Sequence, residues 1–112
     1  MVRTIKINYR ITGTKIFLPF QSVCSITNKG FSGEIIIEYH PKKIVLEYVS
    51  TEDFINQLAK AKTTAEKLAD SVFKKVNKLI KPKYLKVTID IKRSDAHCPV
   101  QVWIESRLQV LP

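Results

Sequence analysis

One amphipathic helix constrains the fold of this chain more than any other stretch of the sequence. Between Thr63 and Pro82, apolar side chains recur with the 3.6-residue period of an α-helix for about four turns. Thr63 as N-cap and Glu66 have the spacing of a capping box, and Pro82 ends the pattern. The predicted buried stripe consists of Ala65, Leu68, Ala69, Val72, Phe73, Val76, Leu79 and Ile80. Such a stripe must be covered, so the rest of the chain has to supply a surface that packs on it.

Segments that alternate apolar and polar residues, as half-buried strands do, lie on both sides of this helix. The alternation predicts strands at Val2–Ile11, from about Gly33 to His40, at Tyr84–Lys92 and at Val100–Ser106. Lys15–Leu18 is interpreted as a short strand that Pro19 ends, and Ile44–Val49 as a short extended run.

A second, shorter helix is predicted to begin after Ser50. Ser50 is a suitable N-cap, and the acidic residues that follow it suit the first turn of a helix. The helix is expected to bury Phe54, Ile55 and Leu58. The resulting order, β-β-α-α-β-β, favours an α+β fold in which an antiparallel sheet carries both helices on one face. The open edges of such a sheet usually need partners.

Size and composition limit the class of protein. The 112 residues, 45% of them hydrophobic, predict a single domain spanning residues 1–112 with a real core. No run of about 18 apolar residues occurs, so neither a transmembrane helix nor a membrane partner is expected. Cys24 and Cys98 are too few for a disulfide scaffold and belong to no CxxC pair, which favours a cytoplasmic location. A single disulfide between them stays open.

The net charge of +9 arises from 19 basic and 10 acidic residues. Lysines concentrate in and after the long helix, at Lys74, Lys75, Lys78, Lys81, Lys83 and Lys86. A basic field of this kind attracts polyanions such as tRNA, and the first five of these lysines are the predicted contacts to tRNA phosphates. A solvated lysine-rich surface explains the same pattern, so both interpretations stay open here.

Cys24 is the candidate nucleophile. It lies in the polar stretch Pro19–Gly33, directly before the strand with Ile35 and Ile37 on one face. A thiol on a loop that a rigid strand supports is a frequent arrangement for nucleophiles. A small buried cysteine with no chemical role is the alternative.

The element order and the residues around Cys24 resemble the tunnelling fold, and within it the 7-cyano-7-deazaguanine reductase (QueF) family. That family has a Cys-Pro-x-Thr-Gly loop and then a strand that ends in tyrosine, and Cys24, Thr27 and Tyr39 have matching spacings. Glu47 matches a family glutamate after that strand, and Glu66 matches the Glu of a His-Glu pair. The segment Pro82-Lys83-Tyr84-Leu85-Lys86-Val87 matches the family's Pro-x-Tyr-x-x-Val. The resemblance implies a barrel-shaped homo-oligomer, a pentamer or decamer, with pockets at subunit boundaries.

The chain departs from the family pattern at several positions. Ser25 replaces the proline after the cysteine, Phe31 replaces an aspartate, and Ala65 replaces the histidine of the His-Glu pair. The cofactor motif of the reductase contains lysine, whereas the corresponding segment 47–52 here has none. The missing motif and the short, basic chain resemble the archaeal branch of the family, the archaeosine synthases. These convert the nitrile of a cyano base in tRNA to an amidine and use no nicotinamide.

The resemblance implies roles for three residues. Cys24 would attack the nitrile carbon and form a covalent thioimide, which ammonia would convert to the amidine. Glu66 would hold the guanine-like edge of the base, although a capping box explains the same residue, and Glu47 is a second candidate for substrate binding. A proton must reach the nitrile nitrogen, and Glu34 and Glu38 are nearby candidate acids. His97 and Cys98 have no further His or Cys to complete a metal site, so neither a metal nor another cofactor is expected.

Two functional hypotheses from different classes follow, with a third behind them. The first is an amidinotransferase that acts on 7-cyano-7-deazaguanine in tRNA with ammonia as nitrogen donor. The second is a protein of the same fold that binds tRNA or a purine-like ligand and has lost catalysis, because Phe31 and Ala65 cannot transfer protons. The third is a nicotinamide-dependent reductase of the free base.

Overall fold

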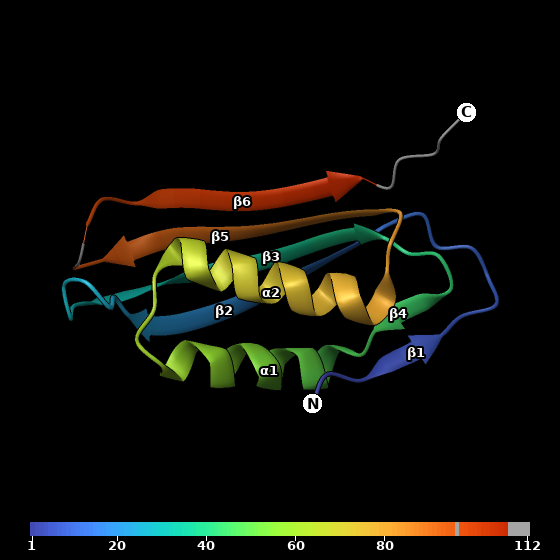
Figure 1. The fold of residues 1–112 in the computed structure, drawn as a ribbon, viewed down its shortest axis with the longest axis horizontal. Helices are drawn as coiled ribbons and strands as arrows, with labels where there is room; N and C mark the ends of the chain where they lie inside the picture. The colour runs from blue at the N-terminus through green and yellow to red at the C-terminus, as the bar shows by residue number, and fades with distance from the viewer. Residues whose placement is uncertain (96, 108–112) are drawn as a thin grey trace.

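A computed structural model of the chain describes residues 1–95 and 97–107. The elements follow the order β1 (Thr4–Lys6), β2 (Thr14–Val23), β3 (Gly30–His40), β4 (Ile44–Leu46), α1 (Tyr48–Lys60), α2 (Ala65–Ile80), β5 (Tyr84–Ser94) and β6 (Val100–Arg107). Both helices lie side by side on one face of the main sheet (Figure 1). The predicted α+β arrangement is therefore confirmed.

The main sheet has the order β2-β3-β5-β6, and all of its neighbouring strands run antiparallel. The strands at its edges are therefore β2 and β6. Alternation along each strand sends one set of side chains toward the helices and the other set to the opposite, helix-free face. Glu34 and Glu38 belong to the second set, because Ile35 and Ile37 between them are fully buried under the helices.

The first strand of the sheet differs from the prediction. Val2–Ile11 was expected to be a half-buried strand, but only Thr4–Lys6 is a strand there, and all three residues are exposed. Alternation of apolar and polar residues did not make this segment a long strand, because no strand of the main sheet pairs with it. The strand β1 pairs only with the three residues of β4. The sheet instead begins with β2, which continues through Pro19. Proline is tolerated there because β2 is an edge strand, which needs no donor on its open side.

Tyr39 connects the sheet to the small β1–β4 pair. Its ring is completely buried, and its hydroxyl oxygen accepts the backbone N–H of Leu46 at 3.0 Å. The backbone N–H of Arg3 donates to the Ser50 hydroxyl at 2.8 Å, which ties the N-terminal segment to the start of α1. The hydrogen bond of Tyr39 therefore stabilises the fold by joining β3 to β4.

Both predicted helix caps are wrong by a few residues. Glu47, and not Ser50, caps α1: its two carboxylate oxygens accept the N–H groups of Val49 at 2.7 Å and of Ser50 at 2.9 Å. The first turn of α1 consequently contains no acidic residue. Thr64, and not Thr63, caps α2, because the Thr64 hydroxyl is the one that accepts the N–H of Lys67, at 3.2 Å. Thr63 instead pairs with the end of the β2 segment, through its N–H to the carbonyl of Val23, and a side-chain pattern alone does not show this long-range contact.

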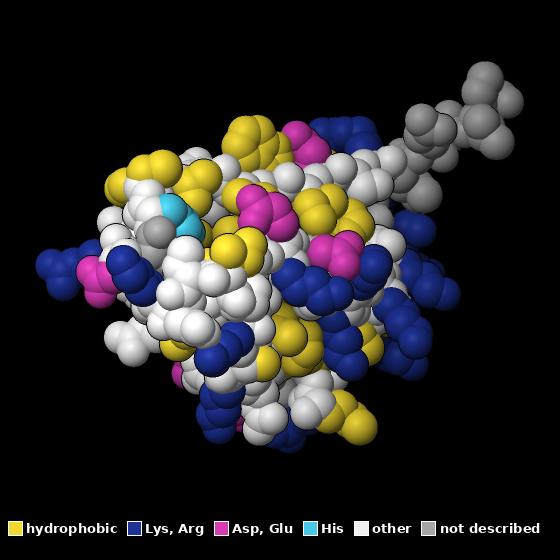
Figure 2. All heavy atoms as spheres, turned by 60° about the vertical axis from the view of Figure 1, so that its left-hand side comes forward, with side chains coloured by type: hydrophobic (Ala, Val, Ile, Leu, Met, Phe, Trp, Pro, Cys, Tyr) yellow, Lys and Arg dark blue, Asp and Glu magenta, His cyan; other side chains and the backbone are white. Residues whose placement is uncertain are grey.

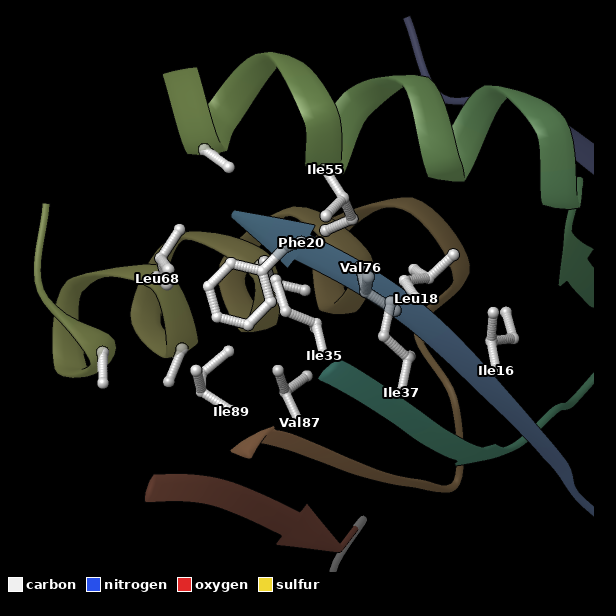
Figure 3. Packing of buried hydrophobic residues seen from close by; sticks show 14 of the residues in the cluster. Ile16, Leu18, Phe20, Ile35, Ile37, Ile55, Leu68, Val76, Val87 and Ile89 are labelled. Atoms are coloured by element: carbon white, nitrogen blue, oxygen red, sulfur yellow. The ribbon is translucent and has the colours of Figure 1, made fainter. Parts of the chain in front are cut away.

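The core fills the space between the sheet and the helices. Side chains of β2, β3 and β5 meet those of α1 and α2 in one cluster, in which Phe20, Ile35, Leu68, Val76 and Val87 point toward one another (Figure 3). The stripe predicted for α2 is buried at Ala65, Leu68, Ala69, Val72, Val76 and Ile80, while Phe73 and Leu79 are half-buried. In α1, Ile55 is buried as predicted, and Phe54 and Leu58 are half-buried against the core.

A bulge bends the sheet near the end that carries Cys24. The register between β3 and β5 shifts at Gly33, so Lys92 has no partner in β3. A Cβ atom added at Gly33 would lie 1.9 Å from the carbonyl oxygen of Asp90, so no other residue fits this close approach. Lys92 instead forms an ion pair with Glu34 on the helix-free face, with a distance of 2.8 Å between Nζ and Oε1.

Candidate functional site

Three connections that are far apart in the sequence meet at one end of the sheet. They are the β2–β3 turn with Cys24, the linker between α1 and α2, and the β5–β6 loop with His97 (Figure 1). The two helices and the strands fix the positions of these loops, because each loop begins and ends in an element that the core holds.

The backbone of Cys24 is bound to the linker before α2. Cys24 and Thr63 form an isolated parallel β-bridge: the N–H of Thr63 donates to the carbonyl of Val23, and the N–H of Ser25 donates to the carbonyl of Thr63, both at 2.9 Å. The hydroxyl of Ser22 adds a bond to the carbonyl of Ala61 at 3.3 Å. The thiol is thereby held beside the amino end of α2.

The turn after Cys24 is closed by its own hydrogen bonds. The N–H of Asn28 donates to the carbonyl of Cys24, and the N–H of Cys24 donates to the carbonyl of Lys29, both at 2.9 Å. Asn28 has a φ of 60°, a left-handed conformation that asparagine adopts more readily than most residues. Lys62 donates to the Asn28 side chain at 2.8 Å, which joins this turn once more to the α1–α2 linker.

The environment of the Cys24 sulfur favours the thiolate. Donation from the Thr27 hydroxyl, and then from the backbone N–H groups of Thr27 and Ile26, lowers the pKa of the thiol from its ordinary value. Burial and the negative charge of Glu66 oppose this effect. Cys24 is 6% exposed, and both cysteines are free thiols. A thiol with a lowered pKa is a better nucleophile near neutrality than a cysteine with no such donors.

A cavity of about 290 Å³ opens at the sulfur. The residues that line it are Cys24, Ile26, Phe31, Thr64, Ala65, Glu66, His97, Cys98 and Val100. Its walls come from all three connections and from the first turn of α2. It is mostly apolar with a few titratable groups, which is the usual character of a small-molecule site.

Glu66 lines the same cavity as Cys24, and the predicted capping box does not explain its position. Because Thr64 is the N-cap, Glu66 is the second residue of α2, and the Thr64 hydroxyl accepts from Lys67 at 3.2 Å. Among the residues that the structure describes, none forms a hydrogen bond or ion pair with the Glu66 carboxylate. The carboxylate is exposed at the cavity and has its acceptor oxygens available for a ligand.

Phe31 and His97 form a contact that the sequence did not predict. Phe31 is 3% exposed and packs edge-on against Phe20, with a centroid distance of 5.8 Å. The imidazole of His97 also packs against Phe31, in a tilted arrangement with a centroid distance of 6.3 Å. Sequence reasoning considered His97 only as a metal ligand, and no periodicity or motif connects it to Cys24.

Glu47, Glu34 and Glu38 are not brought to this cavity. Glu47 precedes α1, whereas Thr63, which pairs with Cys24, follows it. The 13 residues of α1 separate the two ends by about 20 Å. The backbone donors of Ser50 and Val49 lower the pKa of the Glu47 carboxyl, as expected for a cap. Glu34 and Glu38 face away from the helices, so neither is the acid for Cys24 within one chain.

The predicted tRNA-binding lysines form one basic area at the far end of α2. Lys74, Lys78, Lys81 and Lys83 are exposed, whereas Lys75 is half-buried, with its ammonium group 5.9 Å from the ring centroid of Phe54. Lys74 also pairs with Asp70 at 3.0 Å. Figure 2 shows Lys and Arg side chains spread over the visible face, with Asp and Glu among them. The predicted lysines thus lie on the surface of the second half of α2 and just after it, and none of them lines the Cys24 cavity.

Residues 1–95 and 97–107 contain neither a cluster of side chains for a metal ion nor a helix that could span a membrane. No group of three or more His, Cys, Asp and Glu side chains in these ranges is arranged to hold a metal ion. Neither α1 nor α2 is long and apolar enough to cross a bilayer.

Comparison with known proteins identifies the family. The model of the family described as "QueF-like protein" matches residues 31–107, more than half of the chain. The chain belongs to the QueF-like family. A crystal structure of the archaeosine synthase QueF-Like in the apo form superimposes with a TM-score of 0.78 and 26% sequence identity. This match covers 88% of this chain and 96% of that one, so the resemblance to the archaeosine synthase branch and to its tunnelling fold is confirmed. No curated protein matches the chain significantly.

The family match begins at Phe31 and includes Glu47 and Glu66, but not Cys24. The structural argument for Cys24 in this QueF-like protein comes instead from its hydrogen bonds. They hold the residue beside the amino end of α2, where it shares one cavity with Glu66.

Proposed function

We propose that this QueF-like protein is an amidinotransferase that converts the nitrile of 7-cyano-7-deazaguanine in tRNA to an amidine. The observation that supports this most is the single cavity shared by the Cys24 thiol, whose pKa is lowered, and the free Glu66 carboxylate. A nitrile carbon is an electrophile that a thiolate attacks readily. A carboxylate matches the adjacent N–H and amino donors of a guanine-like edge.

The chemistry balances with ammonia as the second substrate. The Cys24 thiolate adds to the nitrile carbon, one bond of the triple bond opens, and the nitrogen takes up a proton to give a thioimide. Ammonia then adds to the same carbon and loses a proton. The carbon–sulfur bond breaks, the Cys24 thiolate departs, and the amidine is the product. No electrons are exchanged with a cofactor, so the reaction needs none.

The substrate class is tested by mass spectrometry of the intact protein with free 7-cyano-7-deazaguanine. The expected result is an adduct on the wild type that is absent in Cys24→Ala and present in Cys98→Ser, the matched variant of the other cysteine in the cavity. An unmodified wild type at saturating ligand would contradict the proposal. A second incubation, with ammonia and tRNA that carries the cyano base, should yield the amidine.

A binding protein without catalysis is the second candidate, and one observation favours it. Phe31 and Ala65, both in the wall of the cavity, are apolar and can neither donate nor accept a proton. This candidate predicts saturable binding of the base without an adduct. The reductase is weaker, because segment 47–52 contains no lysine and Glu47 in it serves as a helix cap.

We also propose that the exposed lysines at the end of α2 bind tRNA phosphates.

We further propose that the chain assembles into a ring. The edges β2 and β6 each have one partner strand and one open side. The helix-free face carries Phe17 and Trp103, both more than half exposed, in register with Ile36 and Thr88 between them. Only such an assembly would bring Glu47 of one copy near the cavity of another. Light scattering should give a multiple of 12.9 kDa at micromolar concentration.

A further inference from the structure

The proposed reaction requires a proton at the nitrile nitrogen when the thiolate adds. Without it, the electron pair that leaves the triple bond would rest on nitrogen as an unstable anion. The residue must therefore lie in the Cys24 cavity and must be able to give a proton and later take one back. The titratable groups that line this cavity are Cys24, Glu66, His97 and Cys98.

His97 is the member of this set whose chemistry fits best. Histidine is the side chain whose two protonation states are both accessible near neutrality. A carboxylate that holds the base needs its oxygens as acceptors, so Glu66 cannot serve both purposes at once. Cys98 is an exposed thiol. A thiol is a weak hydrogen-bond donor and a weak acceptor, so it suits neither the donation of a proton nor its later uptake.

The position of the His97 ring is determined by three contacts. Its Nδ1 lies 2.7 Å from the carbonyl oxygen of Cys98, an acceptor only, so Nδ1 carries a hydrogen and donates it. Its backbone N–H donates to the Ser94 hydroxyl at 3.1 Å. The Phe31 ring packs against the imidazole at 6.3 Å between centroids. With Nδ1 committed to the backbone, Nε2 is the atom left to exchange protons.

We propose that His97 is the proton-transfer residue of this site, an inference that rests on the proposed function. The imidazolium gives its Nε2 proton to the nitrile nitrogen while the Cys24 sulfur bonds to the carbon, and neutral imidazole remains. When ammonia adds to the thioimide, imidazole takes one proton from the new ammonium group. The carbon–sulfur bond then breaks, which restores the thiolate and the imidazolium and releases the neutral amidine.

Phe31 acquires a role in this arrangement. Its buried ring contacts both Phe20 and His97, so it connects the imidazole to the core. An apolar residue in the wall beside the nucleophile is therefore compatible with catalysis, because the proton comes from the β5–β6 loop and not from β3. The two polar requirements of the reaction are met from different elements, with Glu66 on α2 and His97 on the opposite loop.

The test compares rates of adduct formation with free 7-cyano-7-deazaguanine in wild type, His97→Ala and His40→Ala, which removes the other histidine of the chain, outside the cavity. Loss of the proton donor is expected to slow His97→Ala by about 100-fold or more, whereas His40→Ala stays near the wild-type rate. Added imidazole should restore the rate of His97→Ala in proportion to its concentration, which a merely structural role would not allow. Thermal melting should show that His97→Ala is folded, as expected for an exposed residue.

The possible failures are distinguishable. If wild type and His97→Ala form the adduct at the same rate, the role of His97 is wrong while the Cys24 chemistry stands. A slow His97→Ala that imidazole does not accelerate also contradicts the role. If wild type forms no adduct at all, the proposed function fails and the role of His97 fails with it.

Discussion

Cys24 and Thr63 pair as an isolated parallel β-bridge, although Cys24 follows the edge strand β2 and Thr63 lies two residues before the long helix. The bridge holds the sulfur next to the first turn of α2, which also carries Glu66. The proposed nucleophile and the proposed base anchor are therefore held together by this backbone contact.

Replacing Thr27 by valine should raise the pKa of Cys24. The Thr27 hydroxyl is the strongest of the groups that lower this pKa, and valine keeps the shape of the side chain without the donor. Because the thiolate is the reacting form, alkylation by iodoacetamide at a fixed pH near neutrality should be slower. Its pH midpoint should also move upward, and the Cys98→Ser background makes Cys24 the residue that is measured. Thr12→Val, at an exposed position away from the site, is the control and should leave the midpoint in place.

Glu47→Gln should remove a contribution to stability that depends on pH. The backbone donors of Ser50 and Val49 hold the folded-state pKa of this carboxyl below its ordinary value of about 4.3. The contribution is therefore fully present above that value and is lost as the pH falls through the folded-state pKa. Thermal melts of both proteins should show a lower Tm for the variant at pH 7 and a smaller difference at pH 3. A difference in Tm that does not change with pH would contradict the capping role.

Tyr39→Phe should destabilise the fold without touching the site. The substitution leaves the buried N–H of Leu46 without its acceptor, at a cost of about 1–3 kcal/mol. Denaturant unfolding at pH 7 measures this loss. Tyr9→Phe removes the same hydroxyl from an exposed ring and should change the free energy of unfolding by less than about 0.5 kcal/mol. Equal effects of the two substitutions would show that the Tyr39 hydrogen bond contributes nothing.

Alanine at Lys74, Lys78 and Lys81 should weaken tRNA binding in a salt-dependent way. Each phosphate contact contributes close to one unit to the slope of log affinity against log salt concentration, so the slope should decrease by about two to three units. Adduct formation with the free base should stay the same, because these lysines lie outside the cavity.

Alanine at Lys15, Lys60 and Lys92 is the matched control for the lysine prediction. It removes the same charge and, as in the first set, one ion-paired lysine. An equal decrease in both triple variants would mean that net charge, and not the basic area on α2, determines binding.

Periodicity predicted the elements that bury one regular face of apolar side chains in the core. The stripe of α2 and the alternation in β3, β5 and β6 describe faces that the core requires, and the structure has these elements within a few residues of the predicted bounds. The same reasoning failed for Val2–Ile11 and for β2. Alternation shows which face of a strand is apolar but not whether another strand pairs with it, and Pro19 stops a strand only when its missing donor is needed.

The sequence by itself determined the fold class, because local periodicity specifies it, and short motifs indicated Cys24 and Glu66 as candidate site residues. It assigned Glu66 two competing roles, and the structure removed one of them when it placed the helix cap at Thr64. Only the tertiary structure brought His97 into the cavity of Cys24 and into contact with Phe31, since two loops on different strands meet there through long-range pairing. Such a contact has no period and no local spacing, so it exists only once the sheet register and the bridge between Cys24 and Thr63 have formed.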